Sequence, residues 1–541
     1  MFCEKYDAVV IGAGFSGLYM LYRLRQAGLS TQVYEAGGDV GGVWYWNRYP
    51  GAKCDIESIY YNYTFSEELY REWTWTSRYP DQPSILRYIN HVADKFDLRR
   101  DIQFNTRVLS AQWDETQARW LITTDDGRNV SAKYFISGMG CLSASNTPDF
   151  KGLERFQGQQ FHTGTWPHEP VDFTGLRVGV IGTGSSGVQA IPVIAEQAGH
   201  LHVFQRTPQY TTPAVNHAYH PDYLNQVRDN LAQVRAQMQR STLGFPRSVP
   251  QHSALQVSAQ EREATYEANW QRGGWMTGCF NDLVTNPAAN ETVGEFIRGK
   301  IGQIVRDPDV ARKLMPSYYY YGGKRPVLDT HYFETYNRDN VTLVDVKSAP
   351  IVEITERGLR TREQEYELDA LVFATGYDAI TGPLLRIDIR GRGGVSLKEK
   401  WGEGGDIQTY LGLATAGFPN FFTITGPQSP SVLTNMVLSI EQHVDWISDC
   451  LAFMQAGGFN VVEASSQAEQ DWSRRCKAVA DLTLMPRVES WYTGANVEGK
   501  PKGFPIFVGG ANTYREICDK VAEEGYEGFT FATVTVATME V

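Results

Sequence analysis

The sequence lacks most features of secreted, membrane-spanning and nucleic-acid-binding proteins. Its seven cysteines form no C-x-x-C pair, so we expect neither a zinc site nor a redox dithiol, and their odd number argues against a disulfide framework. No apolar run approaches the length of a membrane span, and the net charge of −12 argues against a nucleic-acid partner. The opening residues, MFCEKYDAVVIGAG, leave no room for a signal peptide before a strand pattern. We therefore expect a reduced, cytoplasmic protein that binds no metal, nucleic acid or membrane.

Glycine is plentiful, and its first cluster follows a strand. YDAVVIGAGFSGLYMLYRLRQAG begins with a buried-strand run, turns at Gly12 and continues with apolar residues at helical spacing. In this G-x-G-x-x-G context Gly12 permits a tight turn, Gly14 lets a pyrophosphate approach the backbone, and Gly17 lets the helix pack on the strand. The next predicted strand, 31–34, ends at Glu35, which is placed to accept hydrogen bonds from a ribose. The pattern predicts an FAD site.

A second cluster, LRVGVIGTGSSGVQAIPVIAEQAGHLHVFQRTPQ, repeats the three glycines, at Gly182, Gly184 and Gly187. Where the first unit has Glu35, the second has Gln205 followed by Arg206. A carboxylate would repel a 2′-phosphate, whereas a guanidinium can bind one in a bidentate fork. This unit therefore predicts NADP(H), although an arginine after a strand can also be an ordinary surface charge.

The doubled pattern predicts an α/β fold with two Rossmann-like dinucleotide-binding domains, one for FAD and one for NADP, and a helical insertion. Two more strand-and-turn segments, YFISGMGCLS and ALVFATGYDA, have the form expected where the chain passes between such domains. Helical spacing with a break at Pro308 predicts the insertion. The expected boundaries are 1–142 and 378–541 for a discontinuous FAD domain, 143–211 and 323–377 for the NADP domain, and 212–322 for the insertion.

A flavin beside a nicotinamide implies hydride transfer to FAD and then to a second acceptor. A disulfide acceptor would need a dithiol, which the sequence lacks, so oxygen is the leading acceptor. Oxygen chemistry on a flavin generates anions, which a fixed cation in a dry site stabilises. Lys324-Arg325 in GGKRPVLDTHYF offers such a cation, and Asp55 in RYPGAKCDIESIYY is a candidate to orient it. By itself a Lys-Arg pair is more often a solvated patch.

The segment that joins the two glycine clusters narrows the chemistry. FQGQQFHTGTWP resembles the F-x-G-x-x-x-H-x-x-x-W-P fingerprint of type I Baeyer–Villiger monooxygenases, with matches at Phe156, Gly158, His162, Trp166 and Pro167. Flavin N- and S-oxygenases resemble this stretch but end it with a plain aromatic residue. We interpret His162 as a residue that couples domains, because the sequence supplies it with no catalytic partner.

The resemblance covers nearly the whole chain and is closest to the phenylacetone- and steroid-oxidising branch of the family. It implies an enzyme that uses NADPH and O2 to form a C4a-peroxyflavin, which inserts one oxygen beside a ketone carbonyl to give an ester or lactone. It implies Arg325 as the catalytic cation, oriented by Asp55. It implies FAD contacts at Gly12, Gly14, Ser16, Glu35, Val43, Trp44, Asp55 and Tyr61. It implies NADP contacts at Thr183, Ser185, Ser186, Arg206, Thr207, Lys324 and Trp491, the last of which, taken alone, is more typical of a core residue.

Several points stay open at the level of sequence. GPQSPSVLTNM at 426–436 resembles the substrate loop of the phenylacetone type but departs from it at Gln428 and Val432, so the ketone is not specified. The alternatives are a flavin N- or S-monooxygenase of the same fold and, in another class, a flavin-binding redox sensor. The expected partners are a small ketone and O2, and we expect a monomer. The tail at 531–541 extends past the usual end of the family and has no interpretation.

Overall fold

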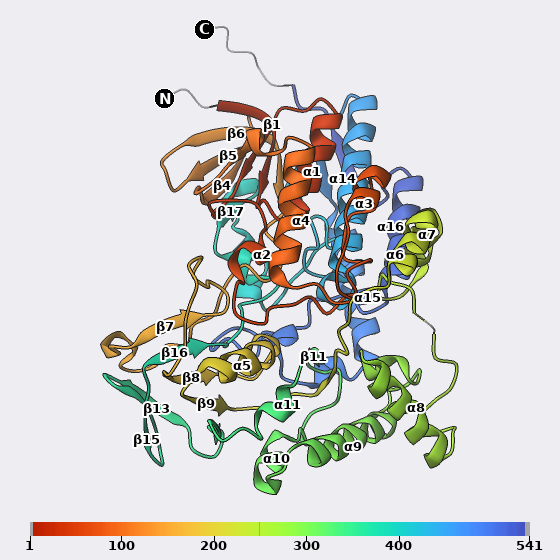
Figure 1. Ribbon diagram of the computed structural model, residues 1–541. Coiled ribbons are helices and arrows are strands. Elements are labelled where there is room, and N and C mark those ends of the chain that lie inside the picture. Colours follow the sequence, from red (N-terminus) through yellow and green to blue (C-terminus); the bar gives the residue numbers. More distant parts are fainter. Residues whose placement is uncertain (1–3, 248, 536–541) are drawn as a thin grey trace.

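Two β-sheets organise the chain, which the computed structural model describes over residues 4–247 and 249–535 (Figure 1). The strand order of the first sheet is β17 (Asp388–Arg390), β4 (Val108–Asp114), β5 (Arg119–Thr124), β6 (Asn129–Ser137), β1 (Glu4–Ile11), β2 (Thr31–Tyr34) and β3 (Ile102–Gln103), and β18 (Phe421–Thr423) also pairs with β6. β1 lies in parallel between β2 and β6, as expected of a dinucleotide-binding unit. β17 and β18 come from the last third of the chain, which therefore rejoins the N-terminal part.

The second sheet consists of five parallel strands. Their order is β12 (Val341–Asp345), β9 (His200–Gln205), β8 (Arg177–Ile181), β16 (Ala370–Phe373) and β7 (Gln159–His162). β8 and β9 carry the second glycine cluster, and β7 carries the fingerprint segment. A small antiparallel sheet of β13 (Ile351–Thr355), β14 (Gly358–Thr361) and β15 (Glu365–Glu367) shares a hydrophobic cluster with this sheet.

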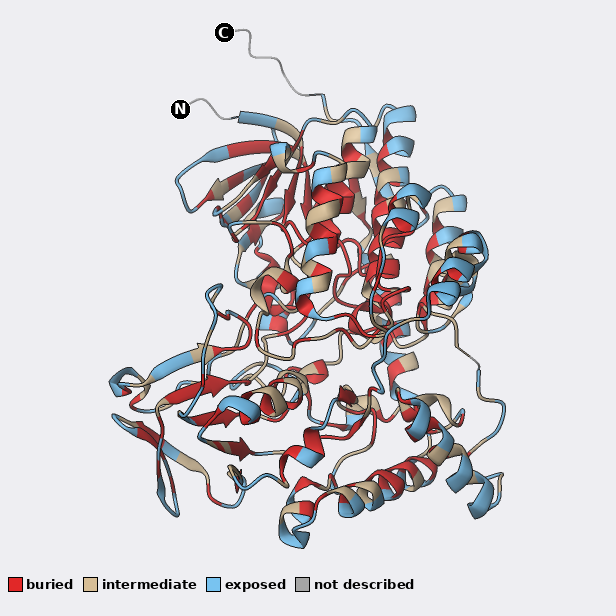
Figure 2. Cartoon of the chain, in the orientation of Figure 1, coloured by how far each residue is buried: buried red, intermediate tan, exposed pale blue. Residues whose placement is uncertain are grey.

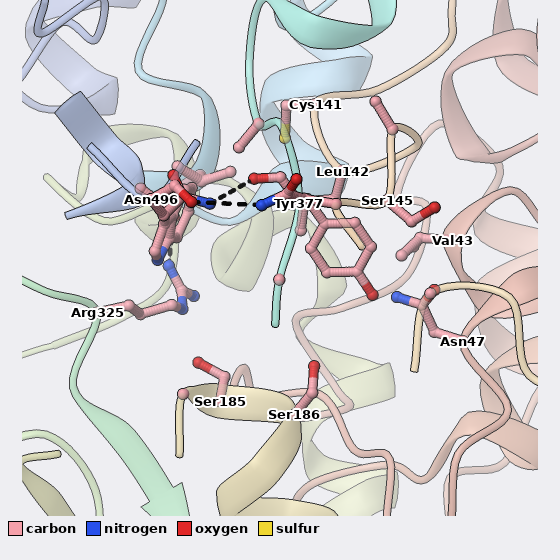
Figure 3. A pocket seen from close by; sticks show the side chains of 18 of the residues that line it. Val43, Asn47, Cys141, Leu142, Ser145, Ser185, Ser186, Arg325, Tyr377 and Asn496 are labelled. Carbon is pink, nitrogen blue, oxygen red and sulfur yellow. Dashed lines mark hydrogen bonds between the residues drawn. The ribbon is translucent and has the colours of Figure 1, made fainter. Parts of the chain in front are cut away.

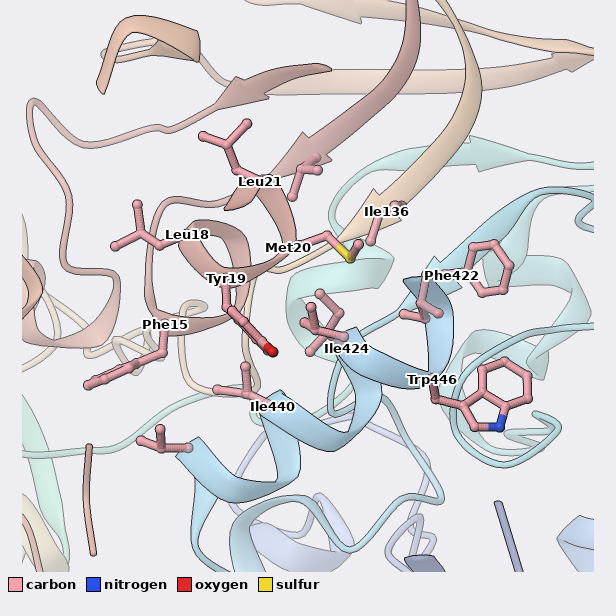
Figure 4. Close-up of a cluster of buried hydrophobic side chains, with 14 of the residues drawn as sticks. Phe15, Leu18, Tyr19, Met20, Leu21, Ile136, Phe422, Ile424, Ile440 and Trp446 are labelled. Atoms are coloured by element: carbon pink, nitrogen blue, oxygen red, sulfur yellow. The ribbon is translucent and has the colours of Figure 1, made fainter. Parts of the chain in front are cut away.

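Helices of the first unit pack around one hydrophobic core. α1 (Phe15–Gln26) and α14 (Met436–Ala456) contact each other, and the side chains between them and the first sheet are drawn in Figure 4, among them Leu18, Met20, Ile440, Ile136 and Phe422. Both helices are buried or half-buried along most of their length, and their exposed residues lie toward their C-terminal ends, at Gln26 in α1 and from Asp449 onward in α14 (Figure 2). Outside the insertion, the other helices are α2 (Val43–Trp46), α3 (Glu67–Glu72), α4 (Gln82–Lys95), α5 (Ser185–Gln197), α11 (Tyr332–Thr335), α12 (Gly382–Leu385), α13 (Leu397–Lys400), α15 (Ser466–Asp481) and α16 (Ala511–Glu523).

The segment between the second glycine cluster and Lys324 is helical. It contains α6 (Pro221–Asp229), α7 (Leu231–Arg240), α8 (Ala259–Arg272), α9 (Pro287–Ile304) and α10 (Pro308–Leu314). Pro308 opens α10, where its missing N–H costs nothing, so the predicted helix break is confirmed. The chain leaves the NADP unit through β10 (Thr211–Pro213) and returns through β11 (Val327–Asp329), and these two strands pair in parallel. This pairing holds in place the segment just before β11, which contains Lys324 and Arg325. The exact domain boundaries stay a prediction.

The tail that had no interpretation is partly structural. β20 (Phe529–Ala532) pairs antiparallel with β19 (Val461–Ala464). The Asn460 side chain then holds the backbone of Val534 by donating to its carbonyl and accepting from its N–H, at 2.8 and 2.9 Å. Residues 536–541 of the tail lie outside the described residues. In the part of the chain that is described, no helix is both long and apolar enough to cross a membrane.

Candidate active site

The first glycine cluster forms a tight junction between β1 and α1. A Cβ on Gly17 would lie 1.7 Å from the carbonyl oxygen of Gly12, so only glycine lets helix and strand approach this closely. A Cβ on Gly14 would lie 3.2 Å from the Cα of Gly42, so backbone lies against backbone there. No side chain caps α1 at Gly14, whereas Asp81 caps α4. The uncapped N-terminus of α1 therefore presents its N–H groups to a ligand phosphate.

The second cluster repeats this geometry between β8 and α5. A Cβ on Gly187 would lie 2.2 Å from the carbonyl oxygen of Gly182, and Gly184 leaves α5 without a side-chain cap. The Thr183 hydroxyl donates to the Thr207 carbonyl at 2.9 Å, which ties this turn to the segment after β9. The chain thus carries two helix N-termini built to accept a phosphate, as a pair of dinucleotide cofactors requires.

The residues that were predicted to distinguish the two cofactors occupy different environments. Glu35 is buried after β2, and its carboxylate accepts from the N–H groups of Ala13 and Gly37, each at 2.7 Å. Burial raises the pKa of Glu35, and these two N–H groups counter that rise. Glu35 thus supports the glycine turn, which the sequence did not predict, and its contact with a ribose stays a prediction. Arg206 is exposed after β9, as a residue that meets a 2′-phosphate should be.

One cavity of about 1750 Å³ connects the two clusters. This exceeds the roughly 300–1,000 Å³ of ordinary small-molecule pockets, as two dinucleotides would need. Of the predicted site residues, Gly17 and Gly187 do not line the cavity, because they act in helix packing. The predicted residues that do line it are Gly12, Gly14, Ser16, Glu35, Val43, Trp44, Asp55, Tyr61, Gly182, Thr183, Gly184, Ser185, Ser186, Arg206, Thr207, Lys324, Arg325 and Trp491.

Arg325 lies on the wall of this cavity just before β11 and forms an ion pair with Asp55. Its Nε donates to Asp55 Oδ2 at 2.6 Å and its Nη2 to Asp55 Oδ1 at 2.9 Å, a bidentate pairing. Nη1 donates to the backbone carbonyl of Val432. Burial alone would lower the pKa of Arg325, but the Asp55 carboxylate raises it above its ordinary value. The guanidinium is therefore a permanent cation facing the cavity.

Lys324 points away from this pair and toward the predicted NADP residues. Its Nζ donates to the Glu489 carbonyl at 2.6 Å, in the segment that leads to Trp491. Burial lowers the pKa of Lys324, and the neighbouring Arg206 cation adds to this effect. The two adjacent cations of the sequence motif therefore face different parts of the cavity.

Sequence reasoning missed several residues of the cavity wall, of which Tyr377 and Asn496 are drawn in Figure 3. The Asn496 side chain donates to the Tyr377 carbonyl at 2.7 Å, and its Oδ1 is buried without a hydrogen-bond partner among the described residues. The Tyr377 ring extends toward Asn47 and Ser186 (Figure 3). The available signal was their place in two segments already singled out by the sequence: Tyr377 lies in ALVFATGYDA and Asn496 ends SWYTGAN.

The fingerprint segment contacts two other parts of the chain, at Asn146 and Trp46. Gly164 N–H donates to His162 Nδ1 at 2.9 Å, so the ring proton is on Nε2, which lies 3.3 Å from the Asn146 carbonyl. Burial lowers the pKa of His162, which is therefore neutral at physiological pH. Trp166 N–H donates to the Trp46 carbonyl at 3.2 Å, which links the fingerprint to α2. The contact with Asn146 suits the predicted role of His162 in coupling different segments of the chain.

Comparison with known proteins identifies the family. Residues 5–237 match the model described as flavin-binding monooxygenase-like. A Baeyer–Villiger monooxygenase from Pseudooceanicola batsensis is 46% identical over 526 residues, which cover 96% of this chain and 95% of that protein. The chain belongs to the Baeyer–Villiger monooxygenases. The predicted family, fold class and activity are confirmed.

Solved structures of this monooxygenase family have the same fold. An oxidized steroid monooxygenase bound to NADP shares 50% identity with a TM-score of 0.93, over 98% of this chain and 100% of that one. The OTEMO complex with FAD and NADP shares 40% identity with a TM-score of 0.94 over the same shares. A phenazine N-monooxygenase from Lysobacter antibioticus is 42% identical over 97% of this chain and 96% of that protein. The monooxygenase described here is a flavoprotein that uses FAD and NADP(H).

Proposed function

We propose that this Baeyer–Villiger monooxygenase oxidises apolar aryl-alkyl or larger cyclic ketones to esters or lactones with NADPH and O2. The observation that carries the proposal is the Arg325–Asp55 pair on the wall of the cavity that connects the two glycine clusters. The apolar side chains of Val432, Met436 and Ile440 line the same cavity. A fixed cation beside apolar walls suits a neutral ketone that gains negative charge during reaction.

The proposed role of Arg325 is electrostatic. Bound FAD would supply the redox chemistry, by accepting hydride from NADPH and passing electrons to O2. Attack on the ketone carbonyl places negative charge on its oxygen, and a preorganised cation in a water-poor site stabilises that charge. Asp55 and the Val432 carbonyl occupy three of the five guanidinium N–H groups. One hydrogen on each of Nη1 and Nη2 is not used by these two partners, and the Tyr492 side chain, which interacts with the guanidinium, shares this region with a ligand.

The proposed ketone class rests on the loop 426–436. Of its two departures from the family pattern, Gln428 does not line the cavity; its Oε1 accepts from both the N–H and the hydroxyl of Thr409. Val432 does line the cavity, so this departure changes the wall that a substrate meets. Each buried apolar Å² contributes about 25 cal/mol, which favours bulky hydrophobic ketones over small polar ones.

The proposed preference for NADPH rests on two cations in one part of the cavity. Arg206 is exposed, and its charge contributes to the lowered pKa of Lys324, so the two side chains are close neighbours. The Glu489 carboxylate interacts with both cations, but its one negative charge does not balance two positive ones. A dianionic 2′-phosphate would offset the repulsion that is left between the cations. NADH has no such group.

N-oxygenation is the second candidate, because a relative named as a phenazine N-monooxygenase is 42% identical. N-oxygenation needs a nucleophilic substrate nitrogen and no stabilisation of a carbonyl oxyanion. The two activities therefore differ in their need for Arg325.

The test compares both substrate classes on the purified holoenzyme. NADPH consumption in air is measured with a panel of aryl-alkyl, small cyclic and large cyclic ketones, and with an aromatic N-heterocycle. The products are identified by mass spectrometry. We expect esters or lactones from the apolar ketones. N-oxide without any ester would favour the second candidate, and NADPH consumption without an oxygenated product from either class would contradict both.

A further inference from the structure

Trp275 reaches Arg325 from the helical segment because two glycines reverse the chain. α8 ends at Arg272, and Gly273 and Gly274 follow with φ values of 77° and 110°, which side chains other than glycine rarely adopt. A Cβ on Gly273 would lie 2.6 Å from the Ala214 carbonyl oxygen. Gly274 N–H donates to the Pro213 carbonyl at 3.0 Å, which anchors the turn on β10. The next residue is Trp275.

The indole ring of Trp275 lies against Arg325. The guanidinium carbon is 5.2 Å from the ring centroid, within the range of a cation–π interaction. The indole Nε1 is buried and has no hydrogen-bond partner in the described part of the chain. The backbone carbonyl of Trp275 accepts from Arg247 Nη2 at 3.2 Å, and the Phe245 ring packs 6.2 Å away. Arg247 and Phe245 thus hold Trp275 in place, and its aromatic face lies against Arg325.

We propose that Trp275 is a positioning residue for Arg325. Asp55 and the Val432 carbonyl hold the guanidinium through N–H groups that lie in its plane, and such hydrogen bonds resist tilting out of that plane only weakly. A ring stacked on the guanidinium opposes that tilt, so Trp275 keeps the two remaining N–H groups directed toward the cavity. The helical segment then supplies part of the active site. This inference rests on the proposed function of Arg325.

The test separates the aromatic face from the rest of the side chain. Trp275→Leu removes the aromatic face, and Trp275→Phe keeps a smaller aromatic face while losing the second ring and an N–H group that has no partner among the described residues. We expect the ratio of ester formed to NADPH consumed, and kcat for the ester, to fall about 3- to 30-fold in Trp275→Leu, the range that the loss of one cation–π contact gives. In Trp275→Phe the ester-to-NADPH ratio and kcat should both stay within about threefold of wild type. KM for the ketone should change little in either variant.

Trp270 supplies the matched control. It lies on α8, packs against Phe296 at 5.9 Å and carries Lys300 over its ring at 5.9 Å. Trp270→Leu should lower the melting temperature without changing the ratio of ester to NADPH. A loss of stability in the helical segment is thereby distinguished from a loss of positioning.

Three outcomes would overturn the inference. The ratio of ester to NADPH could equal that of the wild type in Trp275→Leu, it could fall equally in Trp275→Phe and Trp275→Leu, or the only change could be in the KM of the ketone. The last would make Trp275 a wall of the substrate pocket. Failure of the proposed function is visible separately, because it would appear as undiminished ester formation in Arg325→Ala or as no ester from the wild-type enzyme.

Discussion

Asp55 and Arg325 are 270 residues apart in the sequence and form a bidentate ion pair at 2.6 and 2.9 Å. Their side chains are only 23% and 18% exposed, so water screens the pair weakly. Truncating one member of such a pair leaves the other charge without its partner, which is costly in a buried site. The two residues should therefore be tested separately, because substituting Arg325 removes the cation, whereas substituting Asp55 removes the carboxylate that orients it.

Arg325→Ala should fold, bind FAD and form almost no ester. Removing one preorganised donor costs about 10²–10³ in rate, and a full charge should cost at least as much. Arg325→Lys should rescue little, because a point charge lacks the planar fork that binds Asp55. The measurement pairs anaerobic bleaching of the flavin by NADPH with ester yield in air. Arg312→Ala, at an exposed arginine on α10, is the control. Ester formation near the wild-type rate would show that the Arg325 cation has no role in the reaction.

Asp55→Ala should reduce ester formation less than Arg325→Ala, because Asp55 acts through the guanidinium. The cation itself remains, and its contact with the Val432 carbonyl remains. Product yield per NADPH is the measurement. A loss greater than that of Arg325→Ala would show that Asp55 has a role of its own in the chemistry.

Arg206→Ala should weaken NADPH and leave NADH unchanged. Losing a charged contact to the 2′-phosphate costs about 1.5–3 kcal/mol, or roughly ten- to more than a hundredfold in affinity. Stopped-flow reduction of FAD over a range of concentrations of each coenzyme gives the apparent affinities, and NADH serves as the internal control. Equal weakening of both coenzymes would assign Arg206 to the structure of the site instead.

Val432 should influence the choice of ketone through its side chain alone. Its carbonyl accepts from Arg325, so deleting Ser431-Val432 would disturb the cation as well as the wall, whereas Val432→Ala and Val432→Phe keep the backbone. We expect Val432→Ala to favour larger ketones and Val432→Phe smaller ones, with flavin reduction unchanged. Relative kcat/KM across a ketone panel checks this. An unchanged ranking in both variants would place the substrate elsewhere.

Asp329 should make stability depend on pH. It is buried on β11, accepts from the Thr211 hydroxyl at 2.7 Å, and burial raises its pKa to about 6. The folded state therefore holds a proton that the unfolded chain has lost, so this residue lowers the free energy of unfolding as pH rises from about 4 to about 6. The shift of about two pKa units corresponds to about 3 kcal/mol at neutral pH.

Asp329→Asn should remove that dependence and stabilise the protein at pH 7. Denaturant unfolding of both proteins at pH 4.5 and pH 7 gives the comparison. We expect the difference in stability between them to be much larger at pH 7. A difference that is the same at both values would show that Asp329 is ionised in the folded protein at either pH.

Local patterns made much of this molecule predictable. The spacing of Gly12, Gly14 and Gly17 between a strand and a helix requires only residues that are close in sequence, and the same holds for the second cluster. The contrast between Glu35 and Arg206 was visible because both follow the second strand of their unit. The role of Glu35 in holding the glycine turn was not, because its partners Ala13 and Gly37 meet it only once the strands pair.

The sequence by itself determined the two dinucleotide-binding units, the helical break at Pro308 and, through resemblance, the family. Only the tertiary structure decided how Asp55, Trp275 and Val432 meet around Arg325. These residues come from four separate segments, and their contacts depend on parallel pairing of β10 with β11 and on the glycine turn after α8. Short-range propensity carries no information about such meetings, because the free energy that creates them comes from burying distant segments against one another.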